Sequence, residues 1–112
     1  MPMVPRSSEI DPWELQLFLV ALRDWVLAGK QQMHKSWKFS TTQQALQWHT
    51  LAQAISSTHA RDCFFDLDDI KSGKIETNMI NLADGHLTRE DLAVAIMLNF
   101  LEHEIKKQPI DG

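Results

Sequence analysis

The chain has 112 residues, a formal net charge of −4 and one cysteine, Cys63. Its length is that of one ordinary domain, and 44% hydrophobic residues, among them four Trp and five Phe, are enough to bury a core. The negative charge disfavours a nucleic-acid partner, because phosphate contacts require clustered Lys and Arg. A single thiol forms no internal disulfide, and no apolar run reaches the roughly 18 residues of a membrane-spanning helix.

The N-terminal part is predicted to be a disordered tail over residues 1–10, followed by a helix. The tail is polar and lacks the apolar run of a signal peptide, so we expect a cytoplasmic location. Asp11 is a good N-cap, Pro12 suits the first helical position and Glu14 can close a capping box. The helix should end near Arg23. Its apolar face consists of Leu15, Phe18, Leu19 and Leu22.

A short strand over 25–27, a turn at Gly29 and a second strand over 33–39 come next. The second strand alternates with period two, which is typical of a strand with one buried face. Met33, Trp37 and Phe39 point to one face, whereas His34, Ser36 and Lys38 point to the other. We expect the two strands to pair as a hairpin.

A second helix is predicted from Ser40, where Ser-Thr-Thr-Gln is typical of a capping box, to about Ser57. Its buried stripe consists of Ala45, Trp48, Ala52 and Ile55. Two further alternating strands follow over 63–67 and 75–79, with a turn at 72–73 between them.

The third helix begins at Thr88, and Asp91 stands three residues further on as its capping partner. This helix is apolar on two sides, so both sides should be buried. One stripe consists of Leu92, Ala95 and Ile96, and the other of Leu98, Leu101 and Ile105. Because one side can face the sheet, the sequence predicts a partner surface formed by Leu98, Leu101 and Ile105 together with Trp13.

The element order is therefore α-β-β-α-β-β-α, which indicates an α+β fold with a four-stranded antiparallel sheet and three helices packed on one face. We expect a single domain over residues 11–106 and a C-terminal tail over 107–112. The last strand is expected at a free edge of the sheet, where pairing with a second copy would give a homodimer.

Three segments in this order resemble the pterin-4a-carbinolamine dehydratase family, over a range from about Trp25 to Glu102. The first resembles the family's aromatic strand and central helix through Trp37-Lys38-Phe39, Ala45, Trp48 and Leu51-Ala52. The second resembles the strand before the active-site loop through Ile75, Thr77 and Met79. The third, from Gly85 to Ala93, resembles its helix entry of the type Gly-Leu-(Ser/Thr)-x-x-Asp-x-x-Leu-Ala.

The resemblance implies dehydration of a 4a-hydroxy-tetrahydropterin by histidines, which exchange protons near neutral pH. The family has a His-His-Pro-like motif after the central helix and a Thr-His before the last helix. This sequence has Thr58-His59-Ala60 at the first place and Asn81-Leu82 at the second. Only one of three histidines is kept, and loss of each general acid or base typically costs roughly 10²–10⁴ in rate. We therefore expect no enzymatic activity, and Asp91 is expected to cap the third helix.

With its degenerate pocket, this sequence resembles the RuBisCO assembly factors that share the fold, including the type found beside α-carboxysome genes in autotrophic bacteria. The resemblance implies a chaperone that binds the RuBisCO large subunit, with carboxysome association. Two alternatives stay open: an active 4a-hydroxytetrahydrobiopterin dehydratase, and a dimerisation cofactor for another helical protein. No cofactor is expected. No metal is expected either, because the five histidines lack metal-ligand spacing.

Overall fold

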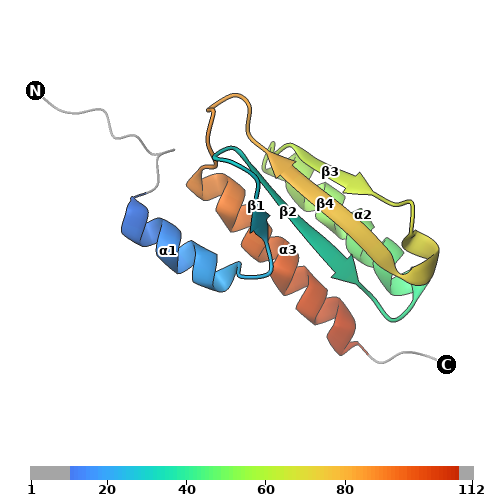
Figure 1. Cartoon of the computed structure of the whole chain (residues 1–112). Helices are drawn as coiled ribbons and strands as arrows, with labels where there is room; N and C mark the ends of the chain where they lie inside the picture. Colours follow the sequence, from blue (N-terminus) through green and yellow to red (C-terminus); the bar gives the residue numbers. More distant parts are fainter. Residues whose placement is uncertain (1–10, 109–112) are drawn as a thin grey trace, which may run out of the picture.

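The computed structural model describes residues 11–108, so the tail predicted over 1–10 lies outside the described residues, as do residues 109–112. The order α-β-β-α-β-β-α and the α+β class are confirmed (Figure 1). The elements are α1 Pro12–Ala21, β1 Val26–Leu27, β2 Gln32–Lys38, α2 Thr42–Thr58, β3 Cys63–Asp66, the short 3-10 helix η1 Ile70–Ser72, β4 Lys74–Ile80 and α3 Arg89–Lys107. Helix α3 thus ends one residue beyond the predicted domain boundary.

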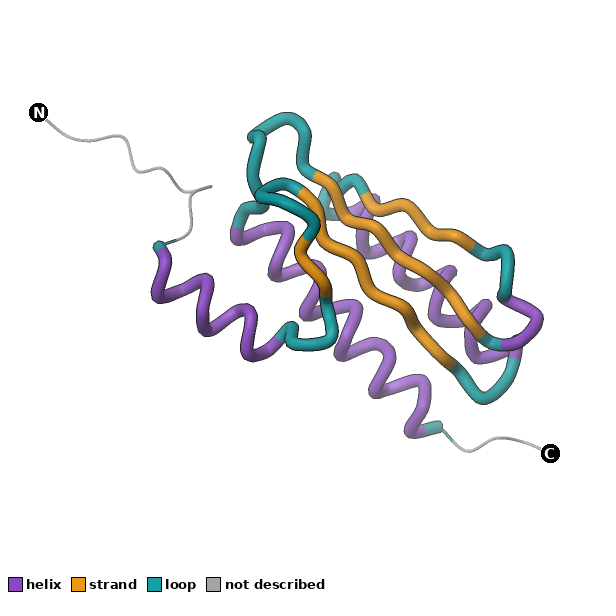
Figure 2. The backbone as a smooth tube through the Cα atoms, in the orientation of Figure 1, coloured by secondary structure: helices purple, strands orange, loops and turns teal. Residues whose placement is uncertain are grey.

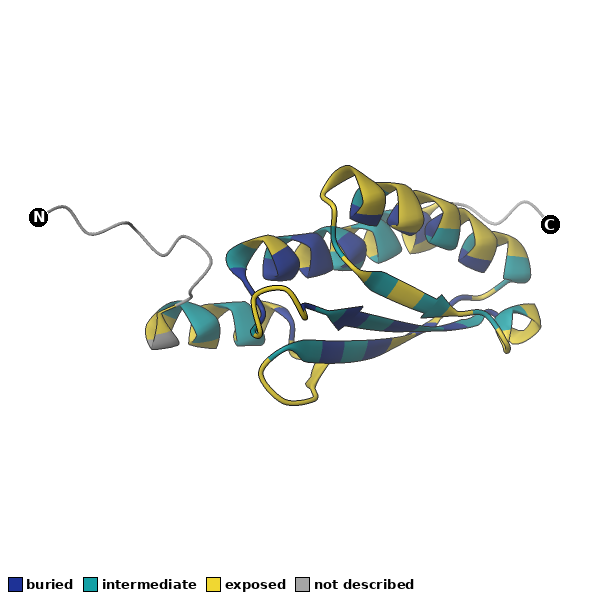
Figure 3. Ribbon diagram, turned by 90° about the horizontal axis from the view of Figure 1, so that it is seen from above, coloured by how far each residue is buried: buried dark blue, intermediate teal, exposed yellow. Residues whose placement is uncertain are grey.

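The helices α2 and α3 lie side by side over one face of the sheet (Figures 2 and 3). Helix α1 lies at the end of this layer, near β1 and the start of α3 (Figure 1). Its Leu15 and Phe18 pack against the buried core. No helix among residues 11–108 is both long enough and apolar enough to cross a membrane.

The sheet has the strand order β1-β2-β4-β3, with every neighbouring pair antiparallel. The last strand, β4, is therefore central, and the expectation that it forms a free edge was wrong. It pairs with β2 from Gln32↔Ile80 to Lys38↔Lys74, and with β3 on its other side. Pairing on both sides satisfies the backbone groups of the longest strands. The edges are the short strands β1 and β3.

The predicted alternation of the strands is confirmed. On β2 the buried side chains are Met33, Lys35 and Trp37, which are paired in register with Met79, Thr77 and Ile75 of β4. Two polar members of this inner face have partners. The Trp37 indole N–H donates to Thr77 Oγ1 at 2.9 Å, and Lys35 Nζ donates to the side-chain oxygen of Asn99 at 3.0 Å. The buried face is therefore apolar except where a hydrogen bond is available.

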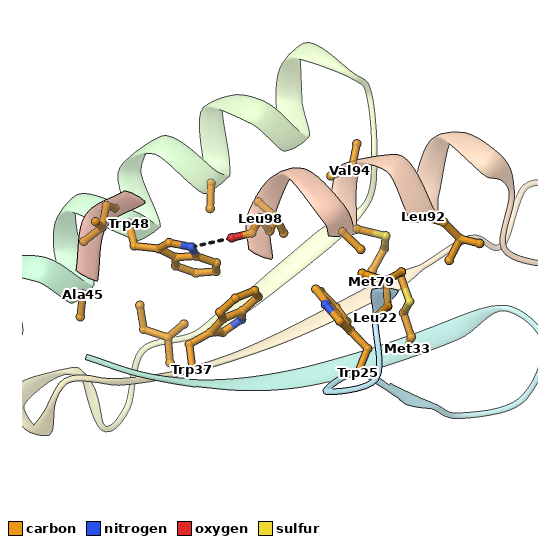
Figure 4. Close-up of a cluster of buried hydrophobic side chains, with 14 of the residues drawn as sticks. Leu22, Trp25, Met33, Trp37, Ala45, Trp48, Met79, Leu92, Val94 and Leu98 are labelled. Carbon is orange, nitrogen blue, oxygen red and sulfur yellow. Dashed lines mark hydrogen bonds between the residues drawn. The ribbon is translucent and has the colours of Figure 1, made fainter. Parts of the chain in front are cut away.

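Three tryptophans form the centre of the core between the sheet and the helices (Figure 4). The Trp37 ring lies 4.4 Å from the Trp48 ring and 5.7 Å from the Trp25 ring, centroid to centroid. The Trp48 indole N–H donates to the Leu98 carbonyl oxygen at 3.2 Å, so it joins α2 to α3. Such aromatic pairs contribute about 0.5–1.5 kcal/mol each beyond the burial of their area.

The buried stripe of α3 differs from the prediction. Leu98 and Ile105 are fully buried in the core, so they cannot form a partner surface. Leu92, Ala95, Leu98 and Ile105 fall on one face at helical spacing, and this single face packs against the sheet and α2. The exposed apolar side chains of α3 are Ile96 and Phe100.

Candidate functional site

The remnant of the expected pocket is a cavity of about 80 Å³ where the end of α2, the end of β4 and the start of α3 meet. It is lined by Ala60, Arg61, Asp62, Ile80, Asn81, Ala83, Asp84 and Asp91. Pockets that enclose small molecules usually measure about 300–1,000 Å³. This cavity is large enough for a few water molecules.

Helix α2 ends in a Schellman motif, and Arg61, the last residue of this motif, lines the cavity. The Ala60 N–H donates to the Ser57 carbonyl at 3.1 Å, and the Arg61 N–H donates to the Ser56 carbonyl at 2.9 Å. Ala60 is left-handed, with φ of 53°, a conformation that usually selects glycine. Strained residues of this kind are concentrated at functional sites.

The loop after β4 is held by its own side chains. The Asn81 side-chain oxygen accepts from the Asp84 N–H at 2.9 Å, and its amide donates to Asp84 Oδ2 at 3.0 Å. The backbone of the loop is also tied to the β1–β2 turn, since the Asn81 N–H donates to the Gln31 carbonyl and the Leu87 N–H donates to the Lys30 carbonyl. The loop that lines the cavity is therefore tied both to itself and to the β1–β2 turn.

Asp91 is the centre of the polar network, and its carboxylate is buried. Its Oδ2 accepts from the Thr88 N–H at 2.8 Å, from the Thr88 hydroxyl at 3.0 Å and from the Asn81 amide at 2.8 Å. Its Oδ1 accepts from Arg61 Nη1 at 3.2 Å. The predicted capping box of Thr88 and Asp91 is thus confirmed, and the carboxylate has partners on both oxygens.

Five positions match the family's active-site segments, and the structure does not bring them together: Thr58, His59, Ala60, Leu82 and Asp91. Ala60 and Asp91 line the cavity. Thr58, His59 and Leu82 are exposed and lie outside its lining. His59 is the C-cap of α2, with its backbone N–H donating to the Ile55 carbonyl and its own carbonyl accepting from Arg61 Nε at 2.9 Å.

The polar side chains at the cavity are three carboxylates, one guanidinium and the Asn81 amide, and none of its lining residues is a histidine. Arg61 and Asp91 neutralise each other, which leaves Asp62 and Asp84 at the lining. Among residues 11–108 no three His, Cys, Asp or Glu side chains are arranged to hold a metal ion. The thiol of Cys63 lies on β3 nearby, and burial raises its pKa above the usual value.

Three residues of the network were not predicted from the sequence: Arg61, Asn81 and Asp84. The spacing of Asn81 and Asp84 in a stretch that ends at Gly85 is a turn signal, since asparagine side chains often accept from backbone N–H groups a few residues on. No local signal marks Arg61, because its partner is 30 positions away.

The other two positions of the predicted partner surface lie outside the core. Trp13 is exposed and lines an apolar groove between α1 and α3. Leu101 is half-buried and lines a second groove, between α2 and α3. Both positions therefore line apolar grooves on the helical side of the fold.

Among solved structures, the chain is similar to the crystal structure of a transcriptional coactivator/pterin dehydratase from Brucella Melitensis. The TM-score is 0.69 at 16% sequence identity, and the likeness covers 83% of this chain and 97% of that one. No protein-family model matches the sequence, and no curated protein is similar to it at a significant level. The chain therefore has a pterin dehydratase-like fold.

Proposed function

We propose that this protein is a non-catalytic binding protein that acts as a RuBisCO assembly factor, a chaperone for the large subunit or its assembly intermediates. The observation that carries the non-catalytic part is the Asp91 network. The carboxylate that matches the family's aspartate is buried and accepts from Asn81, Thr88 and Arg61. Both of its oxygens already accept hydrogen bonds from within the chain, which suits the capping role expected of Asp91.

Two further features support this part of the proposal. The cavity beside Asp91 measures about 80 Å³, which is small for a fused bicyclic pterin ring. At the position where the resemblance implies a histidine, Leu82 presents an exposed apolar side chain. General acid–base catalysis needs a group within hydrogen-bond reach whose pKa is near the working pH, and an isobutyl group supplies none.

The binding part of the proposal is supported by the helical surface. Trp13, Leu17, Val20 and Phe100 are all exposed there. Contiguous apolar surface on a small domain is typical of a protein-interaction site. The solved neighbour is named both as a coactivator and as a dehydratase, which associates the fold with a role between macromolecules as well as with a reaction. The RuBisCO client itself follows from the sequence resemblance.

The test is co-expression of RuBisCO large and small subunits with the full chain in a host that lacks it. We expect the yield of assembled holoenzyme, measured on native gels and by carboxylase activity, to rise at least about twofold, and the chain to co-purify with large subunit. A Leu22→Glu variant is the matched control, since it places a charge in the core and should not fold. An unchanged yield without co-purification would contradict the client assignment.

A further inference from the structure

Helix α1 is attached to the domain less firmly than the other two helices. None of its described side chains is buried, and Leu15 and Phe18, which pack against the core, are half-buried (Figure 3). In contrast, α2 buries Trp48 and α3 buries Leu98. Because hydrophobic stabilisation is roughly proportional to the apolar area removed from water, the packing of α1 contributes less than that of α2 or α3.

The backbone of α1 adds little to this attachment. Among the described residues its hydrogen bonds are local: the Leu15 N–H donates to the Asp11 carbonyl at 2.9 Å, and the Leu22 N–H donates to the Phe18 carbonyl at 2.8 Å. The helix has 10 residues, and isolated helices shorter than about 12–15 residues are marginal in water. Helix α1 therefore depends on its side-chain contacts to stay folded.

The polar contact of α1 with α3 is an ion pair between Glu14 and Arg89, the first residue of α3. Arg89 Nε donates to Glu14 Oε2 at 2.9 Å, and Arg89 Nη2 donates to Glu14 Oε1. Two parallel hydrogen bonds between ionised groups are stronger than one between neutral groups. In agreement with this contact, the hydrogen bond from Arg89 lowers the pKa of Glu14.

The chain becomes buried directly after α1. Leu22, the C-cap of the helix, is 1% exposed. Trp25 is also buried, and its indole N–H donates to Asn99 Oδ1 of α3 at 3.0 Å. The capping box at the start of α3 is formed by Thr88 and Asp91, so it does not involve α1. A boundary between a weakly held helix and a well-packed core therefore lies at Leu22.

We propose that α1 is a separately opening unit, which leaves α3 and unfolds while the domain from Leu22 onward stays folded, and that the Glu14–Arg89 ion pair controls how often it opens. Partial opening of this kind is expected of segments with few buried apolar contacts. The inference is independent of the RuBisCO client and of the lack of catalysis.

Opening would change the surface of α3. The groove between α1 and α3 is lined on the α3 side by Ile96, opposite Trp13, Leu17 and Phe18 of α1. When α1 leaves, Ile96 becomes more exposed and Arg89 loses the Glu14 carboxylate. The closed and open forms therefore differ in apolar area and in charge, the two properties by which a surface selects its partners. Helix α1 is thus a regulatory element of the fold.

The experiment is hydrogen–deuterium exchange of the full chain, followed for individual segments and compared with their unfolded exchange rates. We expect the amides of α1 to be protected at least about 100-fold less than those of β2, β4 and α3. Equal protection of α1 and α3 would overturn the proposal, because it would show that the whole domain opens in one step. An α1 exchanging at the unfolded rate would also overturn it, because no closed form would then be populated.

Glu14→Gln tests the ion pair, since it keeps the shape of the side chain and removes its charge. We expect α1 to exchange about three- to tenfold faster, with β2 and β4 unchanged. The matched control is Glu90→Gln, which removes the same charge from the exposed neighbour of Arg89 and should leave α1 unchanged. Raising the salt from about 0.1 to 1 M should accelerate exchange of α1 in the native chain but not in Glu14→Gln. Equal acceleration in α1 and β4 would contradict the proposal.

A second pair of variants tests the packing of α1. Phe18 packs against the core, whereas Leu17 is 63% exposed. Alanine is the best helix former, so substitution by it leaves the propensity of α1 intact. We expect Phe18→Ala to accelerate exchange of α1 at least about tenfold and Leu17→Ala less than about twofold. Equal effects of the two substitutions would show that α1 is not held by its contact with the core.

Discussion

The side-chain amide of Asn81 donates to the Asp91 carboxylate at 2.8 Å, which ties the end of β4 to the first turn of α3. Asn81 and Leu82 stand where the family resemblance implies Thr-His, and Asp91 matches the family's aspartate. Asn81 therefore adjoins the position of the missing histidine, and Asp91 is the residue expected to cap the third helix. In this chain they are joined to each other and to Arg61, and the network holds three elements in place.

Replacement of Asp91 tests whether the network is structural. Asp91→Ala removes the capping box and the buried acceptor that Asn81 and Arg61 share, so we expect the free energy of unfolding to fall by about 3 kcal/mol. Urea denaturation measures this change. The control is Glu90→Ala, an exposed neighbour in the same helical turn, for which we expect less than about 1 kcal/mol. Equal effects of the two substitutions would contradict the structural role.

Ala60 carries the backbone strain of the site. Ala60→Gly should relieve the left-handed conformation and raise the free energy of unfolding by about 0.5–1 kcal/mol. Ala83→Gly lines the same cavity at a position whose φ is not positive, and we expect it to give no gain. Thermal melts of the two variants beside the native chain distinguish these outcomes. A loss of stability in Ala60→Gly would show that the strain argument is wrong.

Local chemistry made much of the fold predictable. The capping box of Thr88 and Asp91 involves residues three apart, and strand alternation needs only a run of neighbours. The start of α2 was displaced by one residue, since Thr41 and not Ser40 is the N-cap and accepts from the Gln44 N–H at 3.1 Å. Such small errors are common at helix ends.

The remaining features depend on contacts between distant segments. The central place of β4 is set by its pairing with β2, about 40 positions earlier, and no local pattern encodes the order of strands. The burial of Leu98 follows from the rotation of α3 that brings Leu98 into the core, where its carbonyl accepts from Trp48. Arg61 reaches Asp91 only after α2 has ended in its Schellman motif.

Lys35 provides a test of a buried charge. Its Nζ lies 3.0 Å from the Asn99 side-chain oxygen, 3.6 Å from Glu102 and 4.1 Å from the centroid of the Trp37 ring. Lys35→Met keeps the apolar stem and removes the ammonium, and we expect the stability to change by less than about 1.5 kcal/mol.

The complementary substitution removes the acceptor. Asn99→Leu leaves the Lys35 ammonium and the Trp25 indole N–H without Asn99 Oδ1, so we expect a loss of about 2–3 kcal/mol. We expect the double variant Lys35→Met/Asn99→Leu to lose less free energy of unfolding than the sum of the losses in the two single variants. Denaturant titrations of the three variants give the coupling, and strictly additive losses would contradict it.

The reactivity of Cys63 follows from its position. Burial raises the pKa of its thiol, so the thiolate is scarcer at a given pH than in an unfolded chain. We expect slow modification by a disulfide reagent at pH 8, a rate that keeps increasing at pH values where a free cysteine has levelled off, and fast modification in urea. A folded chain that reacts at the unfolded rate at pH 8 would show that the side chain is not shielded.

The central proposal is that the dehydratase-like fold is kept without its chemistry. The most direct test is turnover of a 4a-hydroxy-tetrahydropterin by the native chain, with Thr58→His/Leu82→His assayed beside it. We predict no turnover above the uncatalysed rate for the native chain, and none for the double variant, because the small cavity and the occupied Asp91 carboxylate remain. Turnover of the native chain at an ordinary enzymatic rate would contradict the account and identify it as a pterin enzyme with a different proton relay.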